Sequence, residues 1–138
     1  MSIEVRLGIP GDLASIAQIQ AASPEASQWD VTEYLKYELT VAVCDGSVAG
    51  FAVARRLAEG ESELLNVAVN PAFRRRGIAR RLVAQLTASN PGILWLEVRE
   101  SNAGARKCYE SLGLRESGRR LDYYPPSGET AIVMNVHS

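Results

Sequence analysis

Three strand-like segments in succession constrain the fold of this chain more than any other feature of its sequence. Residues 40–44, 48–56 and 61–69 are rich in Val, Ala and Leu, and only short turns separate them. The first turn contains Asp45-Gly46, a strong hairpin signal between two apolar runs. Two hairpins in a row predict an antiparallel sheet in this part of the chain.

Helix and strand patterns alternate on both sides of these strands. Asp30 followed by Glu33 matches a capping box and predicts the start of one helix. The order predicts an α/β fold, a mixed and mostly antiparallel sheet of about seven strands with about four helices on both faces. A single domain, residues 1–138, accounts for the whole length. The other expected strands are 3–7, 93–98, 114–124 and 130–136, and the expected helices are 10 to about 22, 30 to about 39, 77 to about 89 and 101 to about 112.

Composition and charge argue against several classes of function. The chain has 15 basic and 16 acidic residues, a net charge of −1, whereas a nucleic-acid-binding domain is expected to be basic. Cys44, Cys108 and the single His137 show no metal-ligand spacing, so we expect no metal. No apolar run reaches membrane-spanning length and the N-terminus lacks a leader pattern. We therefore expect a cytoplasmic protein with reduced thiols that binds neither membrane nor nucleic acid.

The segment from Asn70 to Ala79 has the features of a phosphate-binding turn. A strand ends at Pro71, three arginines follow at positions 74–76, and Gly77 begins a helix. A helix N-terminus presents unpaired backbone N–H groups and the positive end of the helix dipole, and both favour phosphate. Gly77 has no Cβ that would obstruct a diphosphate.

The same pattern also fits a solvated basic loop before an amphipathic helix. A Walker-type loop is excluded because no Gly-Lys-Ser/Thr follows, and a dinucleotide fingerprint is excluded because one glycine stands where three are needed. Spacing alone therefore leaves two interpretations of this segment, an anion site and a solvated loop.

Two polar residues stand out after this turn. Glu97 lies within the apolar run Leu94 to Val98, where a carboxylate is costly unless it is paired, neutralised or facing outward. Tyr109 lies in the helix that Ser101 and Asn102 are expected to cap. Without further information, a tyrosine in a helix is usually a packing residue.

Taken together, these segments resemble the GNAT superfamily of N-acetyltransferases. Arg74 to Ala79 reads R-x-x-G-x-A, which is similar to the acetyl-CoA pyrophosphate loop of that superfamily, and Ser101 to Gly113 matches its S-N-x-x-A-x-x-x-Y-x-x-x-G segment. The resemblance implies acetyl-CoA as cosubstrate, with the strand before the loop binding the pantetheine arm through its backbone. The cofactor-binding residues that it implies are Val67, Ala68, Val69, Arg74, Arg75, Arg76, Gly77, Ile78, Ala79, Arg80 and Asn102.

Within the superfamily, the chain is similar to the RimI-like ribosomal-protein N-terminal acetyltransferases over about residues 61–134. In that group the glutamate of the L-E-V strand is the general base and the helical tyrosine is the general acid. The resemblance thus implies Glu97 and Tyr109 as catalytic residues. The residues that it implies on the acceptor side are Trp29, Tyr34, Tyr123 and Tyr124, although the last two also suit packing on a sheet.

The implied reaction is transfer of an acetyl group from acetyl-CoA to a primary amine, foremost the N-terminal α-amine of a protein such as a ribosomal protein. One alternative is a GNAT enzyme that acetylates a small-molecule amine or a lysine side chain. Another is a catalytically silent acyl-CoA-binding regulator, which Glu97 and Tyr109 argue against. Cys108 precedes Tyr109, but successive helical residues do not share a face, so we do not expect a nucleophilic cysteine.

Overall fold

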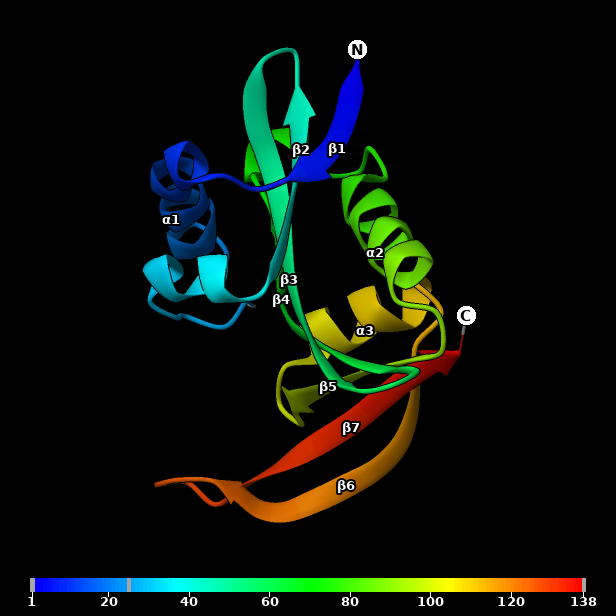
Figure 1. Cartoon of the computed structure of the whole chain (residues 1–138). Helices are drawn as coiled ribbons and strands as arrows, with labels where there is room; N and C mark the ends of the chain where they lie inside the picture. The colour runs from blue at the N-terminus through cyan, green and yellow to red at the C-terminus, as the bar shows by residue number, and fades with distance from the viewer. Residues whose placement is uncertain (1, 25, 138) are drawn as a thin grey trace.

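The computed structural model describes residues 2–24 and 26–137. The strands alternate with helices in the expected order, and Figure 1 shows their arrangement. The strands are β1 (Ile3–Leu7), β2 (Glu38–Cys44), β3 (Ser47–Ala58), β4 (Glu61–Val69), β5 (Ile93–Arg99), β6 (Arg115–Tyr124) and β7 (Glu129–His137). The α-helices are α1 (Leu13–Ala21), α2 (Ile78–Ser89) and α3 (Ala103–Ser111), and the 3-10 helices are η1 (Pro10–Asp12), η2 (Val31–Lys36) and η3 (Pro71–Phe73).

The strands form one sheet in the order β1-β2-β3-β4-β5-β7-β6. Every neighbouring pair is antiparallel except β4 and β5, which run parallel. The prediction of a mixed, mostly antiparallel sheet is therefore confirmed. β4 and β5 can run parallel because the connection between them is a crossover that contains α2, whereas short turns join β2, β3 and β4.

Helices cover both faces of the sheet, and each face has its own buried cluster (Figure 1). On one face Leu82 and Leu86 of α2 lie among the apolar side chains of the central strands. Gly50 of β3 allows this close approach, since a Cβ there would lie 3.2 Å from Cγ2 of Ile78. On the other face, α1 and η2 pack on β3, where Phe51 is fully buried.

The parallel strands β4 and β5 separate soon after they meet. Their pairing covers Glu61, Ser62 and Glu63 opposite residues 93–95. Among the described residues, positions 64–69 of β4 have no partner on β5, so this side of the strand is open to an added strand or an extended ligand, although the Val67 N–H already donates to Asn66 Oδ1. The C-terminal end of β4, which lies in this gap, leads through η3 into the loop before α2.

The expected helix from Asp30 to about Leu39 is wrong in type and length. The segment is the 3-10 helix η2, and β2 begins already at Glu38. Asp30 does cap the turn, because its side chain accepts a hydrogen bond from the Thr32 N–H. The helix ends early because Leu39 is buried in the sheet and its carbonyl accepts a hydrogen bond from Gly8. Strand pairing outweighs the local helical pattern here.

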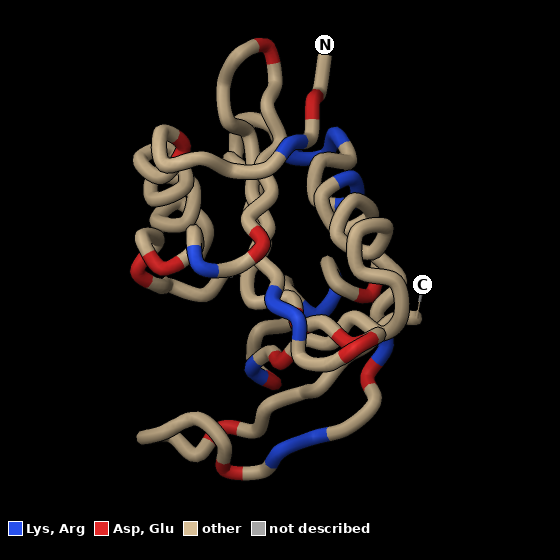
Figure 2. The backbone as a smooth tube through the Cα atoms, viewed as in Figure 1, with Lys and Arg blue, Asp and Glu red and all other residues tan. Residues whose placement is uncertain are grey.

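Acidic and basic residues are interspersed along the chain, in keeping with the net charge of −1 (Figure 2). On β6, Arg119 and Arg120 form a basic stretch with acidic neighbours on both sides along the strand (Figure 2). Within the described residues, no helix is long and apolar enough to span a membrane.

Candidate active site

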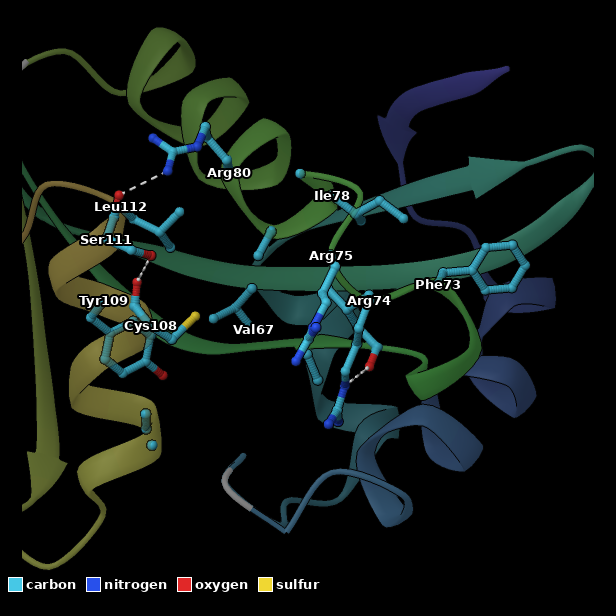
Figure 3. A pocket seen from close by; sticks show the side chains of 16 residues that line it. Val67, Phe73, Arg74, Arg75, Ile78, Arg80, Cys108, Tyr109, Ser111 and Leu112 are labelled. Carbon is cyan, nitrogen blue, oxygen red and sulfur yellow. Dashed lines mark hydrogen bonds between the residues drawn. The ribbon is translucent and has the colours of Figure 1, made fainter. Parts of the chain in front are cut away.

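A cavity of about 480 Å³ lies between the end of β4, the start of α2 and one side of α3 (Figure 3). The residues that line it come mainly from the segments singled out in the sequence. They are Val67, Ala68, Val69, Phe73, Arg74, Arg75, Gly77, Ile78, Ala79, Arg80, Gly104, Ala105, Cys108, Tyr109, Ser111 and Leu112. We call it the cofactor cavity.

The start of α2 gives this cavity its anion-binding character. Gly77 is the N-cap residue with φ of 75°, a conformation that glycine adopts at little cost. The first intrahelical bond runs from the Arg81 N–H to the Gly77 carbonyl, so the earlier N–H groups of the helix have no helical acceptor. A Cβ built on Gly77 would meet no atom within 4 Å beyond its chain neighbours, so space is open beside the start of the helix. Together, these N–H groups and this space suit a diphosphate.

Arginine side chains add positive charge at the same cavity. Arg74, Arg75 and Arg80 all line it. Arg74 comes from the loop before α2, and its Nε lies 3.4 Å from the Val69 carbonyl oxygen (Figure 3). Arg80 reaches across to α3, where it donates a 3.0 Å hydrogen bond to the Ser111 carbonyl (Figure 3). These contacts link the loop to β4 and α2 to α3 around the cavity, whose positive charge favours an anion.

The side chains of α3 form the wall opposite the arginine loop. Both Cys108 and Tyr109 line the cofactor cavity (Figure 3). This corrects the expectation that Cys108 lies off the face of Tyr109. The cavity wraps around the helix from Gly104 to Leu112, so neighbouring residues about 100° apart both reach it.

A second cavity of about 400 Å³ meets the first at Tyr109, which lines both. One of its walls is the segment between α1 and η2, which includes Trp29, and another is β5 with Glu97. We call it the acceptor cavity. Its lining residues are Pro24, Ala26, Ser27, Gln28, Trp29, Leu64, Leu65, Leu96, Glu97, Val98, Arg99, Asn102, Tyr109 and Tyr124.

The Glu97 carboxylate faces this cavity as part of a charged and aromatic surface. Its side chain is 20% exposed, and its Oε1 lies 3.2 Å from Nε of Arg120. Tyr124 lines the same cavity, and the Arg99 guanidinium lies 4.1 Å from the centre of its ring. Burial raises the pKa of the Tyr124 phenol, and the negative charge of Glu97 adds to this effect. Tyr124 is therefore a neutral hydrogen-bonding group at neutral pH.

Four of the implied site residues lie elsewhere than expected. Arg76 is not among the cavity residues, and its guanidinium lies 5.4 Å from the Phe73 ring centre. Asn102 caps α3 by accepting from the Ala105 N–H, and it lines the acceptor cavity rather than the cofactor cavity.

Tyr34 and Tyr123 are the other two. Tyr34 is only 2% exposed and lines neither cavity, so it cannot touch an acceptor without rearrangement. Its hydroxyl forms hydrogen bonds with Gln20 and Asn66 inside the protein instead. Tyr123 is 43% exposed, and its ring packs edge-on against Tyr124 with centroids 5.0 Å apart. It therefore supports a residue of the acceptor cavity without lining that cavity itself.

Sequence reasoning missed most of the acceptor cavity. The wall formed by Pro24 and residues 26–28 carries no motif, and Leu64, Leu65 and Leu96 look like ordinary core positions. No sequence pattern indicated that Phe73 and Leu112 would line the cofactor cavity. Among the described residues, no group of three His, Cys, Asp or Glu could hold a metal ion.

Comparison with known proteins agrees with this geometry. The model of the acetyltransferase (GNAT) family matches residues 13–114, which is most of the chain. The chain belongs to the GNAT acetyltransferase family. It is 40% identical over 107 residues to the ribosomal protein bS18-alanine N-acetyltransferase of Escherichia coli K12, covering 73% of this chain and 70% of that protein. The Salmonella typhimurium protein of the same name is 42% identical over 107 residues, with the same coverage.

Solved structures support the same assignment. The crystal structure of the Escherichia coli ribosomal-protein-S18-alanine N-acetyltransferase superposes with a TM-score of 0.78 at 30% identity, covering 98% of this chain and 93% of that one. A Bacillus anthracis protein solved in complex with acetyl coenzyme A has a TM-score of 0.80 at 20% identity, covering 100% and 99% of the two chains, and shows the shared fold. This GNAT chain is an acetyl-CoA-dependent N-acetyltransferase of the RimI-like type.

Proposed function

We propose that this enzyme acetylates the N-terminal α-amine of a protein, with a ribosomal protein as the foremost candidate. The observation that carries the proposal is Tyr109, which lines the cofactor cavity and the acceptor cavity at once. An acetyl thioester in one cavity and an amine in the other would meet beside this side chain. The relatives named for the alanine of ribosomal protein bS18 support the choice of acceptor.

In this proposal the cofactor is held by the loop and helix start at one end of its cavity. The diphosphate binds the free N–H groups of α2 with Arg74, Arg75 and Arg80 around it. The pantetheine arm lies along the unpaired side of β4 at Val67 and Val69, much as an added strand would. The thioester then lies at the junction with the acceptor cavity.

Acetyl transfer needs an uncharged amine. The Glu97 carboxylate is the general base that accepts the proton of the ammonium, directly or through a water molecule. The amine attacks the thioester carbonyl, whose oxygen gains negative charge. A backbone N–H of β4 beside Val67 would stabilise this charge, and because the Val67 N–H itself donates to Asn66 Oδ1, it would have to share that contact. As the carbon–sulfur bond breaks, the Tyr109 hydroxyl gives a proton to the leaving thiolate of CoA, and the proton that the nitrogen loses on becoming an amide restores the phenol through solvent.

An α-amine suits this chemistry better than a lysine side chain. The ordinary pKa of an α-amine is about 7.7–8.0, so an appreciable fraction is uncharged near neutral pH, whereas that of lysine is about 10.4. One carboxylate can therefore accept the proton from the fraction of the α-amine that is still charged. The walls of the acceptor cavity combine polar groups with apolar side chains, and the apolar part, with Leu64, Leu65 and Leu96, suits the side chain of a small first residue.

The test measures free CoA release and product mass with acetyl-CoA and three acceptors. One is a peptide with N-terminal alanine, one is the same peptide with a blocked N-terminus and an internal lysine, and the third is a panel of small amines. We expect acetylation of the free N-terminus alone. Transfer only to lysine or to small amines would replace the proposed acceptor class. Binding of acetyl-CoA with no transfer to any amine would show a regulator that only binds the cofactor.

A further inference from the structure

A buried hydrogen-bonded network joins β4 to the wall of the acceptor cavity. Asn66 of β4 is 2% exposed. Its Nδ2 donates to the Ser27 carbonyl at 2.9 Å and to the Tyr34 hydroxyl oxygen at 3.0 Å. The Tyr34 hydroxyl in turn donates to Oε1 of Gln20 at 2.5 Å. The network thus connects a strand, α1, η2 and the segment between the two helices.

Backbone groups determine which way the Asn66 amide points. Its Oδ1 accepts from the Ser27 N–H at 3.2 Å and from the Val67 N–H at 3.1 Å, and a backbone N–H can only donate. Its Nδ2 faces the Ser27 carbonyl, which can only accept. No other orientation of the amide satisfies all three contacts. These contacts hold the Asn66 side chain in one orientation, and they also hold the backbone at Ser27 and Val67 in place.

A second anchor lies two residues further along the same wall. Nε2 of Gln20 donates to the Trp29 carbonyl at 2.6 Å. The backbone is therefore held at Ser27 by Asn66 and at Trp29 by Gln20. Ser27 and Trp29 both line the acceptor cavity, as does Glu97 on β5. The network determines where this wall stands relative to the base.

The same asparagine also contacts the cofactor side. Val67, whose N–H it binds, lines the cofactor cavity. Asn66 follows an irregularity in the pairing of β3 with β4, where Asn66 opposes Val53 but Leu64 opposes Ala54. Leu65 is the extra residue of this bulge, and it lines the acceptor cavity. One buried side chain thus holds backbone that belongs to both cavities.

We propose that Asn66 is a positioning residue for acetyl transfer, which sets the distance between the acceptor wall at residues 26–29 and the acyl group beside Val67. The inference rests on the proposed function, since it concerns the acceptor cavity of that reaction. Attack on a thioester needs the two reacting atoms aligned closely, and a displacement of about 1 Å costs about 10²-fold in rate. A fully satisfied buried network is rigid enough to hold such an alignment.

Asn66→Asp is the sharpest test, because it keeps the shape and both acceptor contacts of Oδ1 but replaces the donor with an oxygen. That oxygen would face the Ser27 carbonyl. Tyr34→Phe is a milder second variant that removes only the hydroxyl and keeps the ring beside Phe51. Thr40→Val is the matched control, because Thr40 is equally buried, on β2, and outside the network.

The measurements are kcat and KM for an N-terminal alanine peptide, the affinity for acetyl-CoA by calorimetry, and hydrogen exchange of the amides at 26–29. We expect Asn66→Asp to lower kcat/KM for the peptide by about 10²-fold, with acetyl-CoA affinity kept and exchange at 26–29 faster. Tyr34→Phe should change the same quantities in the same direction by less, and Thr40→Val should leave them unchanged. If Asn66→Asp does not fold, Tyr34→Phe decides.

Three outcomes would overturn the inference while the enzyme acetylates the peptide. The first is wild-type kcat/KM in Asn66→Asp and Tyr34→Phe proteins that fold. The second is a loss of acetyl-CoA affinity in these variants as large as their loss of kcat/KM for the peptide. The third is a loss of kcat/KM in Thr40→Val as large as that in Asn66→Asp. Wild-type protein that acetylates no peptide would instead refute the proposed function.

Discussion

Tyr109 is the side chain through which the two cavities communicate, because it lines both. In the proposed mechanism, the phenol at this junction donates a proton to the sulfur at which the thioester breaks. Such a donor acts late in the reaction and contributes little to holding the ground state. Its loss should therefore appear in turnover and not in cofactor binding.

Tyr109→Phe should lower kcat by about 10²- to 10⁴-fold, the usual range for a general acid, and leave acetyl-CoA affinity unchanged. Steady-state kinetics and calorimetry on the same preparation measure the two quantities. Tyr37→Phe is a suitable control, since Tyr37 is exposed and lines neither cavity. An unchanged kcat in Tyr109→Phe would reduce Tyr109 to a packing residue.

Glu97→Gln keeps the size and hydrogen bonding of the side chain but cannot accept the proton. The defect in kcat/KM should shrink as pH rises from about 7 to about 9, because solvent then deprotonates more of an α-amine. A lysine acceptor would shift this recovery to more alkaline pH. Rate profiles of wild type and variant over that range supply the measurement. A defect that stays constant with pH would show that Glu97 orients the acceptor without taking its proton.

At the level of the elements, the start of α2 and the gap beside β4 do most of the cofactor binding in the proposed site. Gly77 is important there for its backbone and for the space in front of it. Gly60 in the β3–β4 turn offers a close comparison, since it has the same φ of 75° and equally open surroundings. Backbone strain and local space are thereby matched between the two positions.

Gly77→Asp should largely abolish acetyl-CoA binding, because it places a carboxylate and a Cβ where the diphosphate approaches the helix N-terminus. Gly60→Asp should bind acetyl-CoA as the wild type does, although it carries the same charge. Calorimetric titration of both variants makes the comparison. Equal affinity of the two variants for acetyl-CoA would exclude this helix start as the cofactor site.

The elements that could be predicted from the sequence are those whose pattern is local. The Asp45-Gly46 hairpin, the amphipathic α2 and the glycine at its start all depend on neighbouring residues, and the structure contains each of them. The acceptor wall does not, because Asn66 holds Ser27 across 39 positions of sequence. The position of Tyr34 also depends on contacts with residues far away in the sequence. The family resemblance implied a substrate contact for it, but long-range packing directs its hydroxyl inward to Gln20.

On the scale of the whole molecule, the first strand is tied to the helical layer by one ion pair. The Arg6 guanidinium donates to both oxygens of Asp12, at 2.8 and 3.0 Å, and the Ile9 N–H donates to the same carboxylate at 2.9 Å. The hydrogen bonds from Arg6 are the main cause that lowers the pKa of Asp12 below its ordinary value. A carboxyl whose pKa is lower in the folded state stabilises the fold above its unfolded pKa of about 3.9. That contribution is lost as pH falls through the folded value.

Asp12→Asn should lower the free energy of unfolding at pH 7 by about 2 kcal/mol, the scale of hydrogen bonds to a charged group. The difference from wild type should narrow as the pH is lowered below about 4, where the wild-type carboxyl also loses its charge. Urea unfolding at several pH values tests this. A difference that does not depend on pH would mean that shape, and not charge, is what Asp12 contributes.

The arrangement of two cavities that meet at one residue favours direct transfer while both substrates are bound. The rival route passes the acetyl group to Cys108, whose thiol is exposed and lines the cofactor cavity. In that route the Cys108 sulfur would displace CoA to form a second thioester, which the amine would then attack. Cys108 is not among the described residues that line the acceptor cavity, so an acetyl group there would be away from the amine.

Cys108→Ala should therefore retain most of the wild-type turnover. Initial-rate plots against both substrates should intersect, since a covalent intermediate would give the parallel lines of a ping-pong mechanism. Intact mass spectrometry after incubation with acetyl-CoA alone should show no acetylated enzyme, with Cys44, buried at 1% exposure, as an internal thiol that is not expected to react. Parallel plots together with an acetylated Cys108 would replace direct attack by a double displacement. In that case Glu97 would still serve the amine, but Tyr109 would protonate CoA in a first step completed before the acceptor binds.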